Sequence, residues 1–153
     1  MSAEEVLAER IKPQPRWTAA ALADVDHLCQ SDEEGASDLG AVLARSPASG
    51  DLLAGIAACS PFLWRLVVRD PARAARLLAG CPSDRLRHLC GEALAVRDVD
   101  SEPDAMRRLR RLRAEAALLI AMCDLGGVWT VDQVVEALSD FADACVQGAF
   151  GYA

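Results

Sequence analysis

The longest amphipathic segment of the chain runs from Asp104 to Gly127. Its apolar side chains recur every three or four residues and fall, at the rotation of an α-helix, on one stripe about 140° wide. Arginines crowd the first half, the second half is nearly free of charge, and Gly126-Gly127 supplies a left-handed stop. The pattern predicts a long helix with one buried face, formed by Met106, Leu109, Leu112, Ala116, Leu119, Ile120 and Cys123.

Shorter segments with the same periodicity fill the rest of the chain, separated by capping residues and prolines. Ser60-Pro61 and Asp70-Pro71 each place an N-cap residue before a proline at the first helical position. Thr130 and Gln133 have the spacing of a capping box, as do Ser2 and Glu5. No alternating pattern typical of a β-strand occurs. The sequence therefore predicts an all-α fold, an irregular multi-helix bundle of about six to eight helices.

The apolar faces of two of these helices indicate what the bundle buries. In the segment 61–69 the inward positions should be Phe62, Leu63, Leu66 and Val67. In the last helix the apolar side should consist of Val134, Val135, Leu138, Phe141, Ala142 and Cys145.

Length and charge bound the organisation of the chain. With 153 residues it fits a single helical domain, 1–153. The net charge of -7 is unevenly spread: residues 1–60 carry 4 basic and 10 acidic side chains, 61–113 carry 12 and 7, and 114–153 carry 0 and 6. General nucleic-acid binding needs a net positive surface, so this layout argues against it.

The six cysteines are best interpreted as reduced, buried residues of a cytoplasmic protein. We find no signal peptide pattern, and a domain of this size does not need disulfides to fold. The longest charge-free apolar run, 116–123, is far too short to span a bilayer. The sequence therefore predicts a cytoplasmic protein without a membrane partner.

Two pairs of aspartates have the Asp-x-Asp spacing that can hold Mg²⁺ beside a nucleotide. Asp24 and Asp26 sit on a helical pattern and point about 200° apart. Asp98 and Asp100 lie in a linker with no apolar strand before them. We interpret both pairs as solvated surface acids.

Zinc ligation has equally little support. His27 and Cys29, and likewise His88 and Cys90, are two residues apart and do not share a helical face. No Gly-rich phosphate loop and no nucleophile elbow occur. The residues themselves thus predict no catalytic, cofactor-binding or metal-binding site.

The arginine cluster of the long helix has two interpretations. Local ion pairs Asp104–Arg108 and Arg111–Glu115 would make it an ordinary solvated face. Arg113 falls at the edge of the apolar stripe, so its guanidinium should either extend outward to water or pair with a carboxylate of another element. Alternatively the face contacts an acidic partner or an adjoining domain, and its candidate contact residues are then Arg107, Arg110, Arg111 and Arg113.

The order of residues in the last third resembles a known family. The run MRRLRRLRAEAALLIAMCDLGG at 106–127, followed by VDQVVEALSDFADACV at 131–146, resembles the N-terminal helical region of the bacterial glutamine synthetase adenylyltransferase, the bifunctional adenylylating and deadenylylating enzyme. SPFLWRLVVRDP at 60–71 is similar to an earlier stretch of that family. The resemblance covers roughly the second two thirds of the chain, and residues 1–59 match weakly.

This resemblance implies an architecture and a parent activity. In the family the helical region precedes a nucleotidyltransferase core with an Asp-x-Asp pair for Mg²⁺ and ATP, and no such motif follows here. The parent enzyme is implied to control nitrogen assimilation by adding AMP to glutamine synthetase or removing it, and to respond to a signal protein of the PII type. The resemblance therefore implies a module that is non-catalytic alone and packs on the missing core.

Two expectations follow for the surface. If the chain packs on a missing core, the last two helices should leave an apolar area uncovered. If instead it is a free-standing helical interaction protein, the face from Arg107 to Arg113 should bind an acidic partner.

Overall fold

Helices make up most of the described residues, as the hydrophobic periodicity predicts. The computed structural model describes residues 6–99 and 101–152, and within them it has helices and no strand. The all-α prediction is confirmed, with nine α-helices and one 3-10 helix in these residues, slightly more than expected. They are α1 (Leu7–Arg10), α2 (Ala19–Cys29), α3 (Ala36–Arg45), α4 (Pro47–Cys59), α5 (Pro61–Arg69), α6 (Pro71–Ala79), α7 (Pro82–Leu94), η2 (Ala95–Asp98), α8 (Glu102–Leu125) and α9 (Val131–Tyr152).

The helix ends follow the local signals of the sequence. The side chains of Ser60 and Asp70 accept hydrogen bonds from backbone amides in the first turns of α5 and α6. At the start of α9 the Thr130 hydroxyl accepts from the Gln133 amide, and the Gln133 side chain accepts from the Thr130 amide at 2.9 Å. Gly127 takes a φ of 63° after α8, the left-handed turn that glycine permits. The predicted capping box at Ser2 and Glu5 lies outside the described residues.

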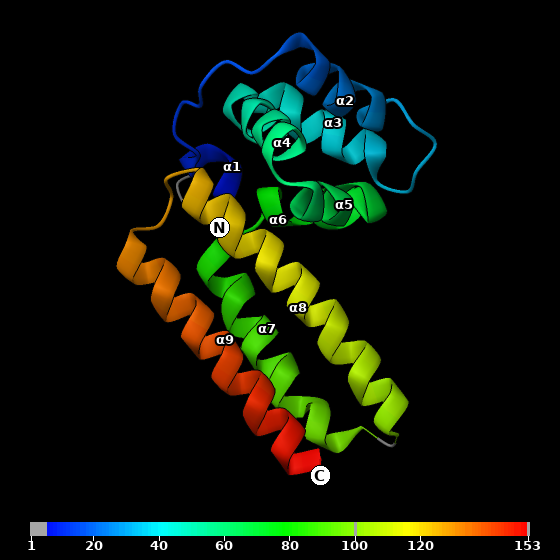
Figure 1. The fold of residues 1–153 in the computed structure, drawn as a ribbon, viewed down its shortest axis with the longest axis vertical. Helices are drawn as coiled ribbons and strands as arrows, with labels where there is room; N and C mark the ends of the chain where they lie inside the picture. Colours follow the sequence, from blue (N-terminus) through cyan, green and yellow to red (C-terminus); the bar gives the residue numbers. More distant parts are fainter. Residues whose placement is uncertain (1–5, 100, 153) are drawn as a thin grey trace.

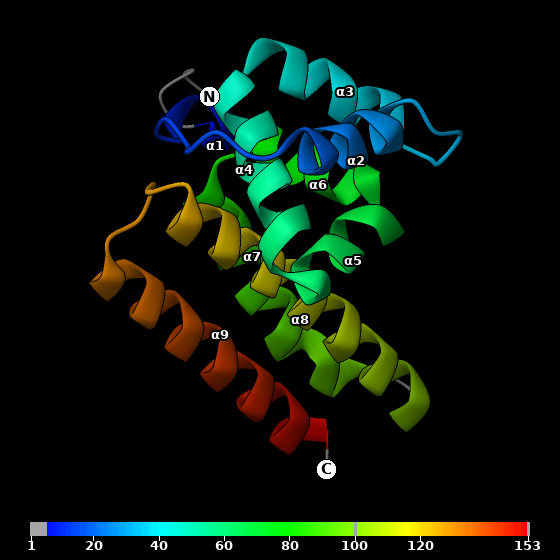
Figure 2. The same cartoon turned by 45° about the horizontal axis from the view of Figure 1, so that its top comes forward.

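The helices form two groups (Figure 1). The short helices α1 to α6 cluster at one end of the molecule. The longer helices α7, α8 and α9 form the other end, with α8 running in the opposite direction to its two neighbours. Figure 2, turned by 45°, shows α2 and α3 at the end of the molecule farthest from the C-terminus. The last helix packs mainly on α7 and also touches α8 and η2.

A continuous apolar core joins the two groups. Fully buried side chains come from both, among them Leu53 of α4, Leu78 of α6, Leu89 of α7 and Leu119 of α8. The N-terminal segment also bridges the groups through the backbone, since the Leu7 amide donates to the carbonyl oxygen of Gly80, which follows α6.

Lys12 extends this bridge, because its amide donates to the Gly126 carbonyl oxygen at 2.9 Å. Arg10 donates from its guanidinium to the Val128 carbonyl oxygen at 3.3 Å. Arg10 and Lys12 therefore hold the connection between α8 and α9 against the short-helix group.

Burial departs from the predicted faces at three places. Met106 and Phe62 were expected to face inward, but 46% and 51% of their surfaces are exposed. On α9, Phe141 is buried and Val134 and Cys145 are half-buried, whereas Val135, Leu138 and Ala142 are exposed. The periodicity marked the helices correctly, but α9 has apolar residues on more of its circumference than α7 and α8 cover.

Candidate functional site

The four arginines predicted as contact residues all lie exposed on the first half of α8. Arg107 pairs with Asp104 one turn earlier. Arg110, Arg111 and Arg113 take part in none of the ion pairs found among the described residues. Arg113 therefore extends outward to water, one of the two outcomes expected for it. These guanidinium groups are available to a partner, and whether one binds there stays a prediction.

Both predicted ion pairs of this helix are wrong. Asp104 pairs with Arg107, not with Arg108, because Ser101 caps the helix and donates its hydroxyl proton to the Asp104 carboxylate. The Ser101 hydrogen bond, together with the Arg107 charge, holds the pKa of Asp104 below its usual value. The Asp104 carboxylate is thus held by the Ser101 hydroxyl and by the Arg107 guanidinium one turn later.

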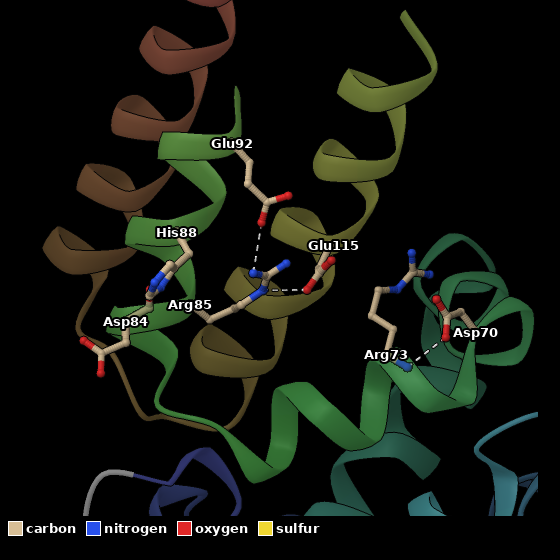
Figure 3. A network of polar contacts seen from close by, with 7 residues as sticks. All are labelled: Asp70, Arg73, Asp84, Arg85, His88, Glu92 and Glu115. Atoms are coloured by element: carbon tan, nitrogen blue, oxygen red, sulfur yellow. Dashed lines mark hydrogen bonds and ion pairs between the residues drawn. The ribbon is translucent and has the colours of Figure 1, made fainter. Parts of the chain in front are cut away.

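Glu115 pairs with α7 instead of with Arg111 on its own helix. Its carboxylate accepts from the Arg85 Nε at 2.8 Å, and Arg85 also donates to Glu92 at 3.1 Å (Figure 3). Glu115 is buried, whereas Arg111 is exposed to solvent, and no ion pair joins them. The hydrogen bond to Glu115 is the main reason why the pKa of Arg85 is raised. The network fixes α7 against α8 and is an interior contact with no free group for chemistry.

The main surface grooves are shallow and mixed in charge. One of about 510 Å³ lies between α7 and α9 and includes Arg87, Cys90 and Asp140. Burial, and then the Asp140 charge, raises the pKa of Cys90, so its thiol stays protonated and is a poor nucleophile. A second groove of about 380 Å³ contains His88, whose Nδ1 lies 2.8 Å from the Asp84 carbonyl oxygen of its own helix. Cys90 and Asp140 share the first groove, and Cys81 and His88 line the second, but no hydrogen bond joins either pair among the described residues.

Magnesium, which the resemblance implies for the parent enzyme, finds no fitting donor set in the described residues. No group of three or more His, Cys, Asp or Glu side chains there could hold a metal ion. Asp24 and Asp26 are both exposed on α2, and Asp98 is exposed at the end of η2. Asp100, the second member of that pair, lies outside the described residues. We therefore derive no step through Mg²⁺ or ATP in this chain.

The most distinctive surface is the outer side of α9. Among the described residues, ten large hydrophobic side chains are exposed, and seven of them belong to the last two helices. This confirms the expectation of an uncovered apolar area on those helices. The sequence contained the signal, since these positions on α9 repeat every three or four residues beside the buried face. The five on α9 are Val131 (74% exposed), Val135 (56%), Leu138 (52%), Val146 (53%) and Phe150 (78%).

Fold and surface together define a class of protein: an all-α fold with an uncovered apolar face, an exposed arginine face and, in its described residues, no group of side chains that could hold a metal ion. The chain belongs to the glutamate-ammonia ligase adenylyltransferase family, whose model matches residues 50–153. The resemblance inferred from the sequence is thereby confirmed. No solved structure matches the chain significantly.

Curated relatives carry the same assignment. A bifunctional glutamine synthetase adenylyltransferase/adenylyl-removing enzyme of Bradyrhizobium sp. strain BTAi1 is 43% identical over 153 residues, covering 97% of this chain and 15% of the relative. One of Rhodopseudomonas palustris strain TIE-1 is 48% identical over 101 residues, covering 65% of this chain and 10% of the relative. The chain thus spans about 15% of the length of the Bradyrhizobium relative. The first 59 residues, expected to match weakly, are largely included in that alignment.

Proposed function

We propose that this chain is a helical module, without catalytic activity of its own, of an enzyme that adds AMP to glutamine synthetase and removes it, and so controls nitrogen assimilation. Its membership of the adenylyltransferase family carries the proposal. The printed name of the Bradyrhizobium relative supplies the activity and the protein substrate. Because the chain matches 15% of that relative, catalysis is assigned to the remaining polypeptide.

The partners of the module follow from its surface. The uncovered apolar face of α9 supports packing on a nucleotidyltransferase core of the same polypeptide. ATP and Mg²⁺ are assigned to that core because the described residues here offer no fitting donor set. A signal protein of the PII type is a further proposed partner of the parent enzyme.

A cytoplasmic location is also proposed. All six cysteines lie in the described part of the chain and are free thiols, as in a reducing compartment. In the same residues, no helix has the length and apolar character needed to traverse a bilayer.

A chimaeric enzyme tests the function. This chain replaces the matched segment of the Bradyrhizobium relative, and AMP on glutamine synthetase is followed by intact-protein mass spectrometry. With ATP and Mg²⁺ the chimaera should add AMP, and with phosphate it should remove AMP. The 153-residue chain alone should do neither. Turnover by the chain alone would contradict the non-catalytic assignment, and a folded but inactive chimaera would contradict the module assignment.

One observation favours a second candidate, a free-standing interaction protein: Arg110, Arg111 and Arg113 are exposed and have no ion-pair partner among the described residues. In that case the chain alone should bind an acidic protein partner in a salt-sensitive manner, and Arg110→Glu should abolish binding. Calorimetric titration of the chain with purified glutamine synthetase checks this. Binding that persists at high salt and in Arg110→Glu would contradict this second function.

A further inference from the structure

The outer side of α9 carries a regular apolar stripe that is separate from its buried face. We define the apolar stripe as Val131, Val135, Leu138, Ala142, Val146 and Ala149, all exposed. At the rotation of an α-helix these six positions span about 80° of the circumference and about 27 Å of its length. The buried side chains of Phe141 and Ala144, which pack on the neighbouring helices, lie about 100° and about 160° from the centre of the apolar stripe.

The spacing of the apolar stripe favours one kind of partner element. Its residues follow one another at intervals of four and three, the seam that packs against another α-helix. A strand would present side chains with a period of two and would not match this seam. Small Ala142 at the centre, exposed between larger side chains, leaves room for a close approach of a second backbone.

An acidic row borders the apolar stripe on its far side from α8. Asp132, Glu136 and Asp143 point about 100–140° around α9 from Val131, and all three are exposed. The described part of α9 contains no basic residue. None of the three acids takes part in an ion pair found among the described residues. A helix lying on the apolar stripe would therefore have three α9 carboxylates without ion-pair partners along one of its sides.

The other side of the apolar stripe faces α8 and is basic. Arg113 is close enough to α9 for its charge to act on Cys145, although burial and then Cys90 dominate and raise the pKa of that thiol. Met106, Arg110, Arg113 and Ala117 share one face of α8, within about 60° of each other. Arg110 and Arg113, which we name the arginine pair, are exposed and without ion partners in the described residues.

We propose that the apolar stripe of α9 seats an amphipathic helix from the rest of the enzyme polypeptide, with acidic side chains beside the arginine pair and basic side chains beside the acidic row. The inference rests on the proposed function, because the chain matches only 15% of the Bradyrhizobium relative and most of that polypeptide lies outside the match. Antiparallel pairing of α9 with a second copy of itself would place two acidic rows side by side, which is unfavourable.

Hydroxyl-radical footprinting with mass spectrometry tests the occupant. The probe is the rest of the Bradyrhizobium polypeptide, joined to this chain in the chimaera described above. Oxidation of Val135 and Leu138 should fall several-fold in the chimaera relative to the 153-residue chain alone. Phe62 and Val68, exposed on α5, are matched controls and should react equally in both.

Charge reversal tests the chemistry of the two edges. In the chimaera, Arg110→Glu with Arg113→Glu should restore much of the oxidation of Leu138. Arg65→Glu with Arg69→Glu, two exposed arginines of α5, should not. If Leu138 stays protected from oxidation in the chimaera with Arg110→Glu and Arg113→Glu, the proposal that charge selects the docked helix is overturned.

Two further outcomes would overturn the proposal. One is unchanged oxidation of Leu138 in an active chimaera, which leaves the proposed function standing. The other is a fall in Leu138 oxidation in the chain alone as its concentration rises, which would show that a second copy of the chain covers the apolar stripe. AMP transfer by the chimaera and oxidation of Leu138 are measured separately. A folded chimaera that transfers no AMP contradicts the proposed function, whereas unchanged Leu138 oxidation in an active chimaera contradicts only the docked helix.

Discussion

At the scale of single residues, long-range partners replace the local ones that the sequence suggests. Glu115 is buried and accepts from Arg85 of another helix, although Arg111 stands four residues away on its own helix. Cys123 is fully buried, whereas Cys59 is exposed. The environment of each side chain thus depends on which element covers it, and two measurements follow.

Removal of Glu115 should destabilise the chain more than removal of Glu92. Glu115→Ala leaves the partly buried Arg85 guanidinium with Glu92 as its remaining carboxylate acceptor. It should lower the free energy of unfolding by about 1–3 kcal/mol. Glu92→Ala should cost less than about 1 kcal/mol, because its side chain and Arg85 are each about one-third exposed and water screens the pair. Urea denaturation followed by circular dichroism compares them, and equal losses would contradict this ranking.

Thiol labelling should separate Cys59 from Cys123. Burial raises the pKa of Cys123 from 9.0 to about 12, so in the folded chain its thiol stays protonated and shielded. As the pH rises through 9.0 the unfolded chain gains a thiolate that the folded chain does not, so folding stability falls in this window. Mass spectrometry after timed alkylation should show Cys59 modified first and Cys123 last. In the chain unfolded by urea, the two thiols should be alkylated at similar rates. Equal rates in the folded chain would contradict the burial.

At the scale of elements, α7 and α9 approach each other more closely than their sequences reveal. A Cβ built on Gly148 would lie 2.1 Å from the Ala93 carbonyl oxygen of α7. Gly91 is the opposite case, since a Cβ there meets nothing within 4 Å. Gly148, and not Gly91, is therefore the glycine at which a close helix crossing leaves no room for a side chain.

Alanine at these two glycines should therefore act in opposite directions. Gly148→Ala should destabilise the chain by about 1–3 kcal/mol, because the clash is with backbone and the two helices must move apart. Gly91→Ala should stabilise it by roughly 0.5–1 kcal/mol through helix propensity alone. Urea midpoints measure both variants, and stabilisation by Gly148→Ala would show that α7 and α9 are not in contact there.

At the scale of the whole molecule, the exposed large hydrophobic residues are concentrated on the last two helices. Large exposed hydrophobic residues gather on α8 and α9, and only Leu22, Phe62 and Val68 stand elsewhere in the described chain. An uncovered face of this kind marks an interaction surface in a folded protein. This distribution supports the proposal that the chain packs on a further part of the enzyme polypeptide.

The apolar stripe should bind a fluorescent apolar dye in the folded chain. Val135→Gln with Leu138→Gln should reduce the dye signal. Phe62→Gln should change it less, because Val68, the other large exposed hydrophobic residue of α5, lies about 120° around that helix. Both variants should keep the free energy of unfolding within about 0.5 kcal/mol, since the replaced residues are exposed. Equal dye signals from all three proteins would contradict a concentrated apolar face.

The sequence by itself determined the elements and the family. Ser60, Asp70 and Thr130 mark helix starts because a cap involves backbone groups within three residues, and Gly127 marks an end for the same local reason. The runs at 106–127 and 131–146 were sufficient for the family resemblance.

Only the tertiary structure decided which apolar face of each helix is covered. Val135 and Phe141 are equally apolar in the sequence, yet one is exposed and the other is buried against neighbouring helices. The same holds for the Arg85–Glu115 pair, which joins residues 30 positions apart. Burial and pairing depend on the arrangement of distant elements in space, and periodicity within one helix carries no information about that arrangement.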